Sequence, residues 1–194
     1  MKFGQKLILG LVLICGCESL GIAQSNLPHR RQVEHGTDVD AVKIQLKPTV
    51  VSVEELLALR DKTCSKMDFA KFRDRRFKPF EMTVYRISGT LISIRVDKEG
   101  DLNFVVKGRT GARAIIEIPE ADECKGSPFL AKMIEVRQIL ETRFHPKRDV
   151  LALSEPITVE GIGYLGSRRK AGDKPFGETV RLMPAIRVEF GVAH

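Results

Sequence analysis

Five strand-like runs and one amphipathic helix follow one another between residues 82 and 190. In the runs, apolar residues recur with a period close to two, which indicates strands with one buried face. The runs cover residues 82–96, 102–107, 112–118, 157–165 and 179–190, and the helix is expected at 127–144. The order strand, strand, strand, helix, strand, strand predicts a mainly β fold, namely a five-stranded OB-type barrel over residues 82–194.

The ends of these elements carry local signals. Ser127 can cap the helix, Pro128 suits its first position, and Pro146 stops it. Gly89 lies in the middle of the first long strand, where a small barrel needs a bend or a bulge. Pro119 ends the third strand because proline cannot donate to a strand ladder.

A short N-terminal α/β segment, residues 33–81, precedes the barrel, and we expect it to wrap around it. Val42, Ile44 and Leu46 alternate, which predicts a short strand. Ser52 and Glu55 form a capping box, so a helix of two to three turns is expected after them.

Residues 66–78 interleave phenylalanines with basic residues. Such a pattern can bind single-stranded nucleic acid through phosphate contacts and base stacking. It also arises where one apolar face packs and the charges stay in water. We favour packing for this stretch.

The first 23 residues have the features of an export signal. Lys2 and Lys6 precede an apolar core at residues 7–14, which is too short to span a bilayer. Two processing sites compete. Cys17 follows a lipobox-like sequence and would be the lipid-modified first residue; alternatively, cleavage after Ala23 would release a chain that starts at Gln24. We favour lipidation of Cys17, with residues 24–32 as a tether, and either site predicts a protein outside the cytoplasm, in the cell envelope or secreted.

Outside the leader only Cys64 and Cys124 remain. Two cysteines in an exported chain most simply form one disulfide. Such a bridge would join the N-terminal segment to the loop after the third strand. Neither cysteine has a second ligand at a zinc-like spacing, so the sequence predicts no metal site and no cofactor.

The formal net charge of +7 suggests anionic partners such as nucleic acid, lipid headgroups or cell-envelope polymers. OB-type barrels bind ligands on the face of their second and third strands and through two neighbouring loops. In this chain the first loop is acidic and contains Asp97 and Asp101. The second loop is basic and contains Arg168, Arg169, Lys170 and Lys174.

Several motifs, taken in their order and spacing, resemble a known family. They are Gly36-Thr37-Asp38-Val39-Asp40-Ala41, Leu46-Lys47-Pro48, Asp97-Lys98-Glu99-Gly100-Asp101 with Leu102-Asn103, Glu117-Ile118-Pro119, Cys124 with Ser127-Pro128-Phe129, Arg137, and Val159-Glu160-Gly161-Ile162-Gly163-Tyr164. Over roughly residues 33–190 the chain resembles a family of exported bacterial OB-fold-like proteins of unknown function. The resemblance implies the fold and export, and it implies no established activity.

The chain departs from that family at three places. Family members carry histidine at the position of Asn103, and a His-Gly pair where this chain has Arg168-Arg169-Lys170. They carry Glu-Leu-His-Pro where this chain reads Arg181-Leu182-Met183-Pro184. If those histidines serve a metal or catalytic site, this chain has lost it. Asn103 directly follows the acidic turn, and we keep it among the candidate ligand-binding residues.

Three functions remain open from the sequence. The first, which we favour, is a non-catalytic binding module whose barrel face takes an anionic or extended ligand. The second is a metal-dependent phosphodiesterase in which Asp97, Asp101 and Glu117 hold a divalent cation and Arg113 holds a phosphate. The third is a structural or protein-interaction component of the cell envelope. No nucleophile–base motif points to an enzyme of another class.

Overall fold

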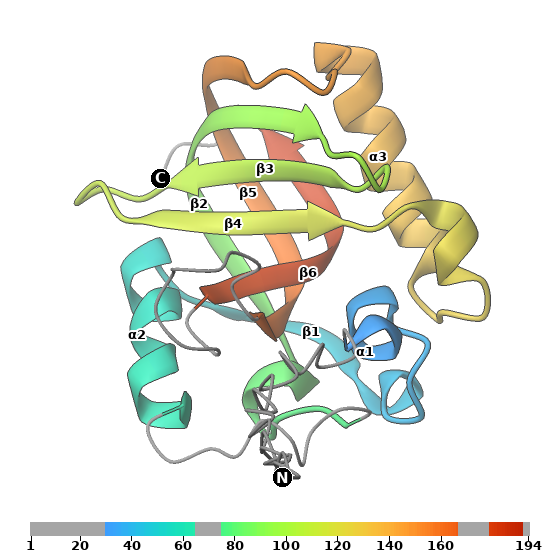
Figure 1. Ribbon diagram of the computed structural model, residues 1–194. Helices are drawn as coiled ribbons and strands as arrows, with labels where there is room; N and C mark the ends of the chain where they lie inside the picture. The colour runs from blue at the N-terminus through green and yellow to red at the C-terminus, as the bar shows by residue number, and fades with distance from the viewer. Residues whose placement is uncertain (1–29, 65–74, 167–178, 192–194) are drawn as a thin grey trace, which may run out of the picture.

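The protein is mainly β, with three helices and one six-stranded sheet in which the strands β2 to β6 close into a ring and β1 pairs with β2 outside it (Figure 1). The computed structural model describes residues 30–64, 75–166 and 179–191, and only the backbone of residues 60–64 and 179. The strands are β1 (Gln45–Val50), β2 (Thr83–Val96), β3 (Leu102–Lys107), β4 (Arg113–Ile118), β5 (Leu151–Gly166) and β6 (Thr179–Phe190). The helices are α1 (Arg31–His35), α2 (Val53–Cys64) and α3 (Leu130–Phe144), with short 3-10 turns η1 (Ala41–Lys43), η3 (Phe80–Met82) and η4 (Ala121–Cys124).

The ring closes because the long strand β2 has two antiparallel partners. The sheet order is β1-β2-β3-β4-β6-β5, and β2 also pairs with β5. The weakest seam lies between β4 and β6, which run parallel and pair only at Ile115 with Arg181 and at Ile116 with Leu182. Helix α3 packs beside this seam and contacts β6. The strand order therefore brings the third and last strands of the predicted barrel together.

The core lies inside the ring and follows the strand period. In β3 the side chains of Leu102, Phe104 and Val106 are buried, whereas those between them face outward. Helix α3 adds Met133, Val136 and Leu140, which lie on one face at helical spacing.

The middle of β2 requires glycine. A Cβ atom on Gly89 would lie 2.5 Å from the carbonyl oxygen of Lys107 and 2.8 Å from a methyl of Val106. The register between β2 and β3 shifts just after it, between Leu91 and Ser93. The expected irregularity in the first long strand is present, and close approach of β3 is its physical reason.

Two buried ion pairs hold residues 30–38 against the stretch just before β2. The side chains of Asp38 and Arg76 are both fully buried and meet at 2.6 Å. Glu81 is also fully buried; its carboxylate accepts two hydrogen bonds from Arg30, at 2.6 and 2.7 Å, and one from the Leu165 amide at 2.8 Å. These contacts make the segment a structural part of the fold.

Helix α1 contacts the turn η4 and the helix that follows it. His35 Nε2 lies 3.2 Å from a carboxylate oxygen of Glu123, and burial lowers the pKa of His35. Gly36 ends α1 with a positive φ of 65° and lies against the ring of Phe129. A left-handed residue with no side chain is therefore needed at this position.

The capping box before α2 is present. The Glu55 amide donates to Ser52 Oγ at 3.1 Å, and the Ser52 amide donates to the Glu55 carboxylate at 2.7 Å. The helix that it starts has 12 residues, slightly longer than expected. Glu54 accepts hydrogen bonds from the amide and hydroxyl of Thr110, which holds α2 against the turn between β3 and β4.

Three boundaries differ from the sequence expectation by more than one residue. The strand expected around Val42 starts only at Gln45, because residues 41–43 form a 3-10 turn. The long helix starts at Leu130, because the Phe129 amide donates to Ser127 Oγ within a preceding turn. Strand β5 starts at Leu151 rather than at residue 157, since backbone pairing with β2 extends a stretch that lacks an apolar pattern.

The predicted disulfide is wrong for the structure described here. Cys124 is a free, buried thiol in η4, and burial raises its pKa to about 12. A disulfide needs Cα atoms within about 7 Å. Figure 1 shows α2, which ends at Cys64, at the left of the ring and α3, which contacts η4, at the right. The positions of the two cysteines along the chain did not reveal that α2 and η4 are far apart in the fold.

Several sequence expectations lie outside the described residues: the export signal with Cys17, the tether up to residue 29, most of the basic–aromatic stretch, and the loop that holds Arg168, Arg169, Lys170 and Lys174. Among the helices that the structure describes, none is long and apolar enough to cross a membrane.

Candidate functional site

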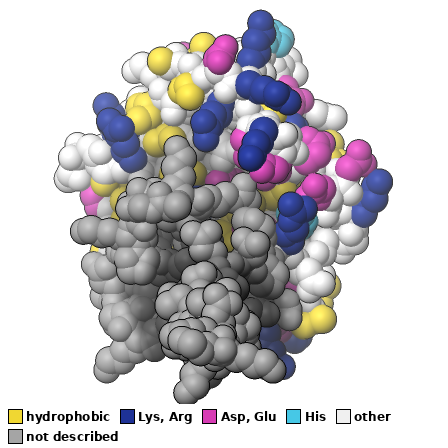
Figure 2. Space-filling view, in the orientation of Figure 1, with side chains coloured by type: hydrophobic (Ala, Val, Ile, Leu, Met, Phe, Trp, Pro, Cys, Tyr) yellow, Lys and Arg dark blue, Asp and Glu magenta, His cyan; other side chains and the backbone are white. Residues whose placement is uncertain are grey.

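The outer face of β2, β3 and β4 brings together most of the described candidate residues. Side chains that alternate with the core residues point outward from all three strands, and strand pairing places them in rows. Figure 2 shows Lys and Arg side chains over the area of these strands, and Asp and Glu side chains gathered toward the right-hand end. The outward residues are Ser93 and Arg95 from β2, Asn103, Val105 and Lys107 from β3, and Arg113, Ile115 and Glu117 from β4.

Two basic side chains face each other at one end of this surface. Lys107 and Arg113 are direct partners in the antiparallel register of β3 and β4, and both are exposed. Within residues 30–64, 75–166 and 179–191, neither forms an ion pair or a side-chain hydrogen bond. Like charges directly opposite each other on neighbouring strands are destabilising. An anion between them would relieve that repulsion.

A third basic residue lies at the other end of β3. Arg95 is exposed and opposes Asn103, which is four residues before Lys107 on the same strand. Four residues of strand span about 14 Å. Between these ends, Val105 and Ile115 are partners in the register and form a half-buried aliphatic floor. The face therefore has cations at both ends and an apolar centre.

The acidic turn before β3 is built from its own hydrogen bonds. Asp97 Oδ1 accepts from the amides of Glu99 and Asp101, each at 3.0 Å. Its other oxygen accepts from Asn103 Nδ2 at 3.2 Å. Asp97 and Asn103 thus hold the turn in shape.

Asp101 is directed away from the open surface. Its Oδ1 accepts a hydrogen bond from the Glu120 amide at 2.9 Å. Burial raises the pKa of Asp101 to about 6; the bond from Glu120 opposes that shift, and the nearby Asp97 and Glu117 carboxylates add to it. The fold therefore favours the protonated form of this carboxyl group.

We expect Asp101→Asn to raise the melting temperature at pH 7.5 more than at pH 4.5. Because the folded-state pKa of Asp101 is raised, its stabilising contribution is present below about pH 4 and is lost as the pH rises through about 6. The gain at pH 7.5 is roughly 1 kcal/mol, since solvent screens part of the effect. Thermal unfolding at both pH values measures it, with the exposed Asp122→Asn as the control. Equal gains at both pH values would contradict the assignment.

Glu117 forms an ion pair with Arg181 of β6. It does not pair with Arg113, which lies on the same strand, or with Arg137 of α3. The pairing of β4 with β6 explains this, because Ile115 and Arg181 lie opposite each other.

Arg137 of α3 binds the acidic turn between β2 and β3. It donates to the Gly100 carbonyl oxygen at 2.8 Å and lies 3.2 Å from a carboxylate oxygen of Glu120 and 2.7 Å from one of Glu141. Through these bonds the turn between β2 and β3, η4 and α3 form one connected unit.

The three carboxylates of the phosphodiesterase hypothesis do not converge. Asp97, Asp101 and Glu117 each bind a different protein group, as described above. In the described part of the chain, no group of three or more His, Cys, Asp or Glu side chains could hold a metal ion. Arg113 lies at the far end of β4 from Glu117.

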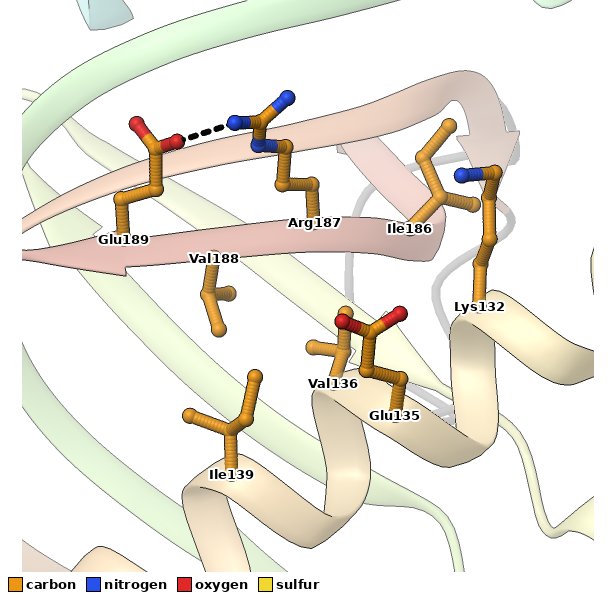
Figure 3. Close-up of a pocket in the computed structure, with 8 residues that line it drawn as sticks. All are labelled: Lys132, Glu135, Val136, Ile139, Ile186, Arg187, Val188 and Glu189. Carbon is orange, nitrogen blue, oxygen red and sulfur yellow. Dashed lines mark hydrogen bonds and ion pairs between the residues drawn. The ribbon is translucent and has the colours of Figure 1, made fainter.

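A groove lies between α3 and β6 and has a volume of about 330 Å³. Figure 3 shows Val188 pointing into it toward Val136 and Ile139, whereas Arg187 and Glu189 point to the other side of the strand. Arg187 and Glu189 neutralise each other at 2.5 Å. This groove is apolar at its centre and carries balanced charge at its rim.

The sequence reasoning missed Arg95 and Lys107 as site residues. A signal for Lys107 was present, because Lys107 and Arg113 flank the turn at residues 108–112 at symmetric positions. No protein-family model matches this chain, and no curated protein matches it significantly. The site is therefore interpreted from its geometry.

Proposed function

We propose that this protein is a non-catalytic binding module that takes an extended anionic ligand on the outer face of β2, β3 and β4. We further propose that the closed ring is an OB-type barrel. The order β2-β3-β4-β6-β5, closed by the pairing of β2 with β5, supports this proposal. The position of α3 also supports it, because along the chain α3 follows β4 and precedes β5, the third and fourth strands of the proposed barrel.

The carrying observation is the pair of exposed cations, Lys107 and Arg113. They oppose each other in register and have no partner within the described residues. A protein gains no stability from this arrangement. It becomes favourable when a phosphate, carboxylate or sulfate group binds both side chains. In OB-type barrels this is also the face that binds extended ligands.

Export to the cell envelope belongs to the same proposal. The apolar leader and Cys17 support it, as does the resemblance to exported proteins. A lipidated Cys17 would hold the binding face close to a membrane surface and to envelope polymers. Mass spectrometry of the mature protein distinguishes a lipidated chain from one that starts at Gln24.

Reversing both charges of the cation pair is expected to abolish most of the binding. We expect Lys107→Glu with Arg113→Glu to weaken binding of oligothymidylate and of an acidic glycan by at least about tenfold at low salt. Fluorescence anisotropy across a salt series measures the affinity. For the single-stranded oligonucleotide, loss of two contacts should reduce the slope of log K against log salt by about 1.4.

A double variant with the same change of charge at two other positions provides the control. Arg148→Glu with Lys132→Glu alters two exposed residues outside this face and should leave the affinity close to that of the unchanged protein. Undetectable binding of both probes at the lowest salt would overturn the proposal. So would binding that the Lys107 and Arg113 changes leave unaltered.

The groove between α3 and β6 favours a second candidate function, a role in protein interaction. Its apolar centre at Val136, Ile139 and Val188 suits a protein partner better than a polyanion. A partner recovered from envelope extracts after nuclease treatment, and lost with Ile139→Lys, would support this role. No observation favours the phosphodiesterase, because each of its carboxylates is already bound by another group of the fold.

A further inference from the structure

The outer face of β2, β3 and β4 also carries information about the kind of ligand. This step rests on the proposed function, because it concerns the same surface. We infer that the ligand is an acidic polysaccharide segment that lies along β3 and reaches from the Lys107–Arg113 pair to Arg95.

The spacing of the cations sets a minimum length. Lys107 and Arg113 form one anion position, and Arg95, opposite Asn103, forms the other. The four strand residues between Asn103 and Lys107 span about 14 Å. A ligand must carry negative charges at least this far apart to use both positions. A single anion or a two-ring sugar can occupy only one of them.

The centre of the face suits sugar rings. Val105 and Ile115 are half-buried partners, and Ser93 opposes Val105 from β2. An aliphatic floor packs against the C–H face of a sugar ring, and a hydroxyl beside it can bond to a sugar hydroxyl. No acidic side chain extends from this central row, so the sugar rings between the two anion positions meet no repelling charge there.

Nucleobases find no stacking partner on the described part of this face. Binding of single strands draws much of its affinity from bases stacked on aromatic side chains. Phe104, the aromatic residue of β3, points into the core and is 1 % exposed. Tyr85 and Tyr164 are also buried, and no aromatic side chain among the described residues is fully exposed. Recognition by charge and sugar contacts is therefore favoured over recognition of bases.

Acidic groups lie near both ends of the face. Asp97 and Glu117 are near Asn103, but Asp97 binds its own turn and Glu117 pairs with Arg181. At the other end, Glu54 accepts hydrogen bonds from Thr110 in the turn between Lys107 and Arg113. The Arg95 position therefore has one cation near two carboxylates, whereas the Lys107–Arg113 position has two cations near one. We therefore expect the cation pair to bind first and Arg95 to add affinity only for longer ligands.

A series of oligogalacturonates of increasing length tests this inference on the full mature chain. Calorimetry should show a gain in affinity of about tenfold or more from the dimer to the tetramer, because only the tetramer reaches both anion positions. Further lengthening should add little. Arg95→Gln should lower the affinity for the tetramer to near that for the dimer and leave the dimer unchanged. Lys132→Gln, at an exposed residue of α3 beside the α3–β6 groove, is the matched control.

The outcomes separate this inference from the proposed function. If oligothymidylate of equal charge binds at least about tenfold tighter than the tetramer, the ligand is a nucleic acid and the inference is wrong. If both bind through Lys107 and Arg113 with no dependence on length or on Arg95, the binding face stands and the inference fails. If neither probe binds at low salt, the proposed function itself fails.

Discussion

Asp38→Ala is expected to lower the free energy of unfolding by about 3–5 kcal/mol. The reason is that Arg76 would keep its charge in a fully buried place with no counter-ion. Arg76 Nε lies 3.0 Å from each oxygen of Asp38, and Nη2 lies 2.6 Å from one of them. The remaining donors reach only backbone carbonyl oxygens, those of Val33 and Glu81, each at 3.2 Å.

Urea unfolding followed by circular dichroism measures this loss. The exposed pair Lys125–Asp122, at 3.1 Å, supplies the matched control, and Asp122→Ala should change stability by less than about 0.5 kcal/mol. The double variant Asp38→Leu with Arg76→Met removes both charges and should recover most of the loss. An Asp38→Ala protein as stable as the Asp122→Ala protein would show that the buried pair is not formed.

This result would matter for the whole N-terminal segment. Asp38 comes from its first turns and Arg30 lies just before it, whereas Arg76 and Glu81 come from the stretch just before β2. The two buried pairs therefore join chain segments about 40 and 50 residues apart, as the separations of 38 and 51 show. Their loss should detach α1 from the sheet before the ring itself opens.

Gly89→Ala is expected to lower stability by about 3 kcal/mol, at the upper end of the usual cost of overpacking. The added methyl would lie 2.5 Å from the Lys107 carbonyl oxygen, which is backbone and cannot turn aside. Relief requires β2 and β3 to separate where Thr90 pairs with Lys107. The change would thus weaken the pairing of β2 with β3, and β3 carries Lys107, one of the two residues of the proposed anion position.

Gly111→Ala is the control, because Gly111 is needed for its backbone angle, whereas Gly89 is needed for the space that a side chain would fill. Gly111 has a φ of 91° and no atom within 4 Å of an added Cβ. Its cost comes only from left-handed backbone strain, about 1–2 kcal/mol. Thermal unfolding of both variants compares the two effects. Hydrogen exchange should show faster exchange of the β2 and β3 amides in Gly89→Ala alone. A smaller loss for Gly89→Ala than for Gly111→Ala would contradict the close approach of the two strands.

Local patterns predicted the regular elements well. The strands at residues 102–107 and 179–190 have the expected bounds, and α3 ends at Phe144 as expected. The capping box before α2 is also present. These features depend on periodicity and on residues three or four apart, so the sequence contains all the information that they need.

The candidate site was predicted only in part. Arg113 lies on the outer face of β4, whereas Asp97, Asp101 and Glu117 are used by the fold itself. Both uses of a carboxylate, in a turn or toward a ligand, need the same residue type. Residue identity could not separate them, whereas the hydrogen-bond partners do.

The sequence by itself determined which residues form strands and which face of each strand is buried, because burial alternates with a period that is written along the chain. Only the tertiary structure decided how distant residues meet: closure of β2 on β5, Glu117 beside Arg181, and Cys124 far from α2 in the fold. The physical reason is that these contacts join segments many residues apart. Their formation depends on strand order and on the packing of the whole ring, and no short pattern encodes either.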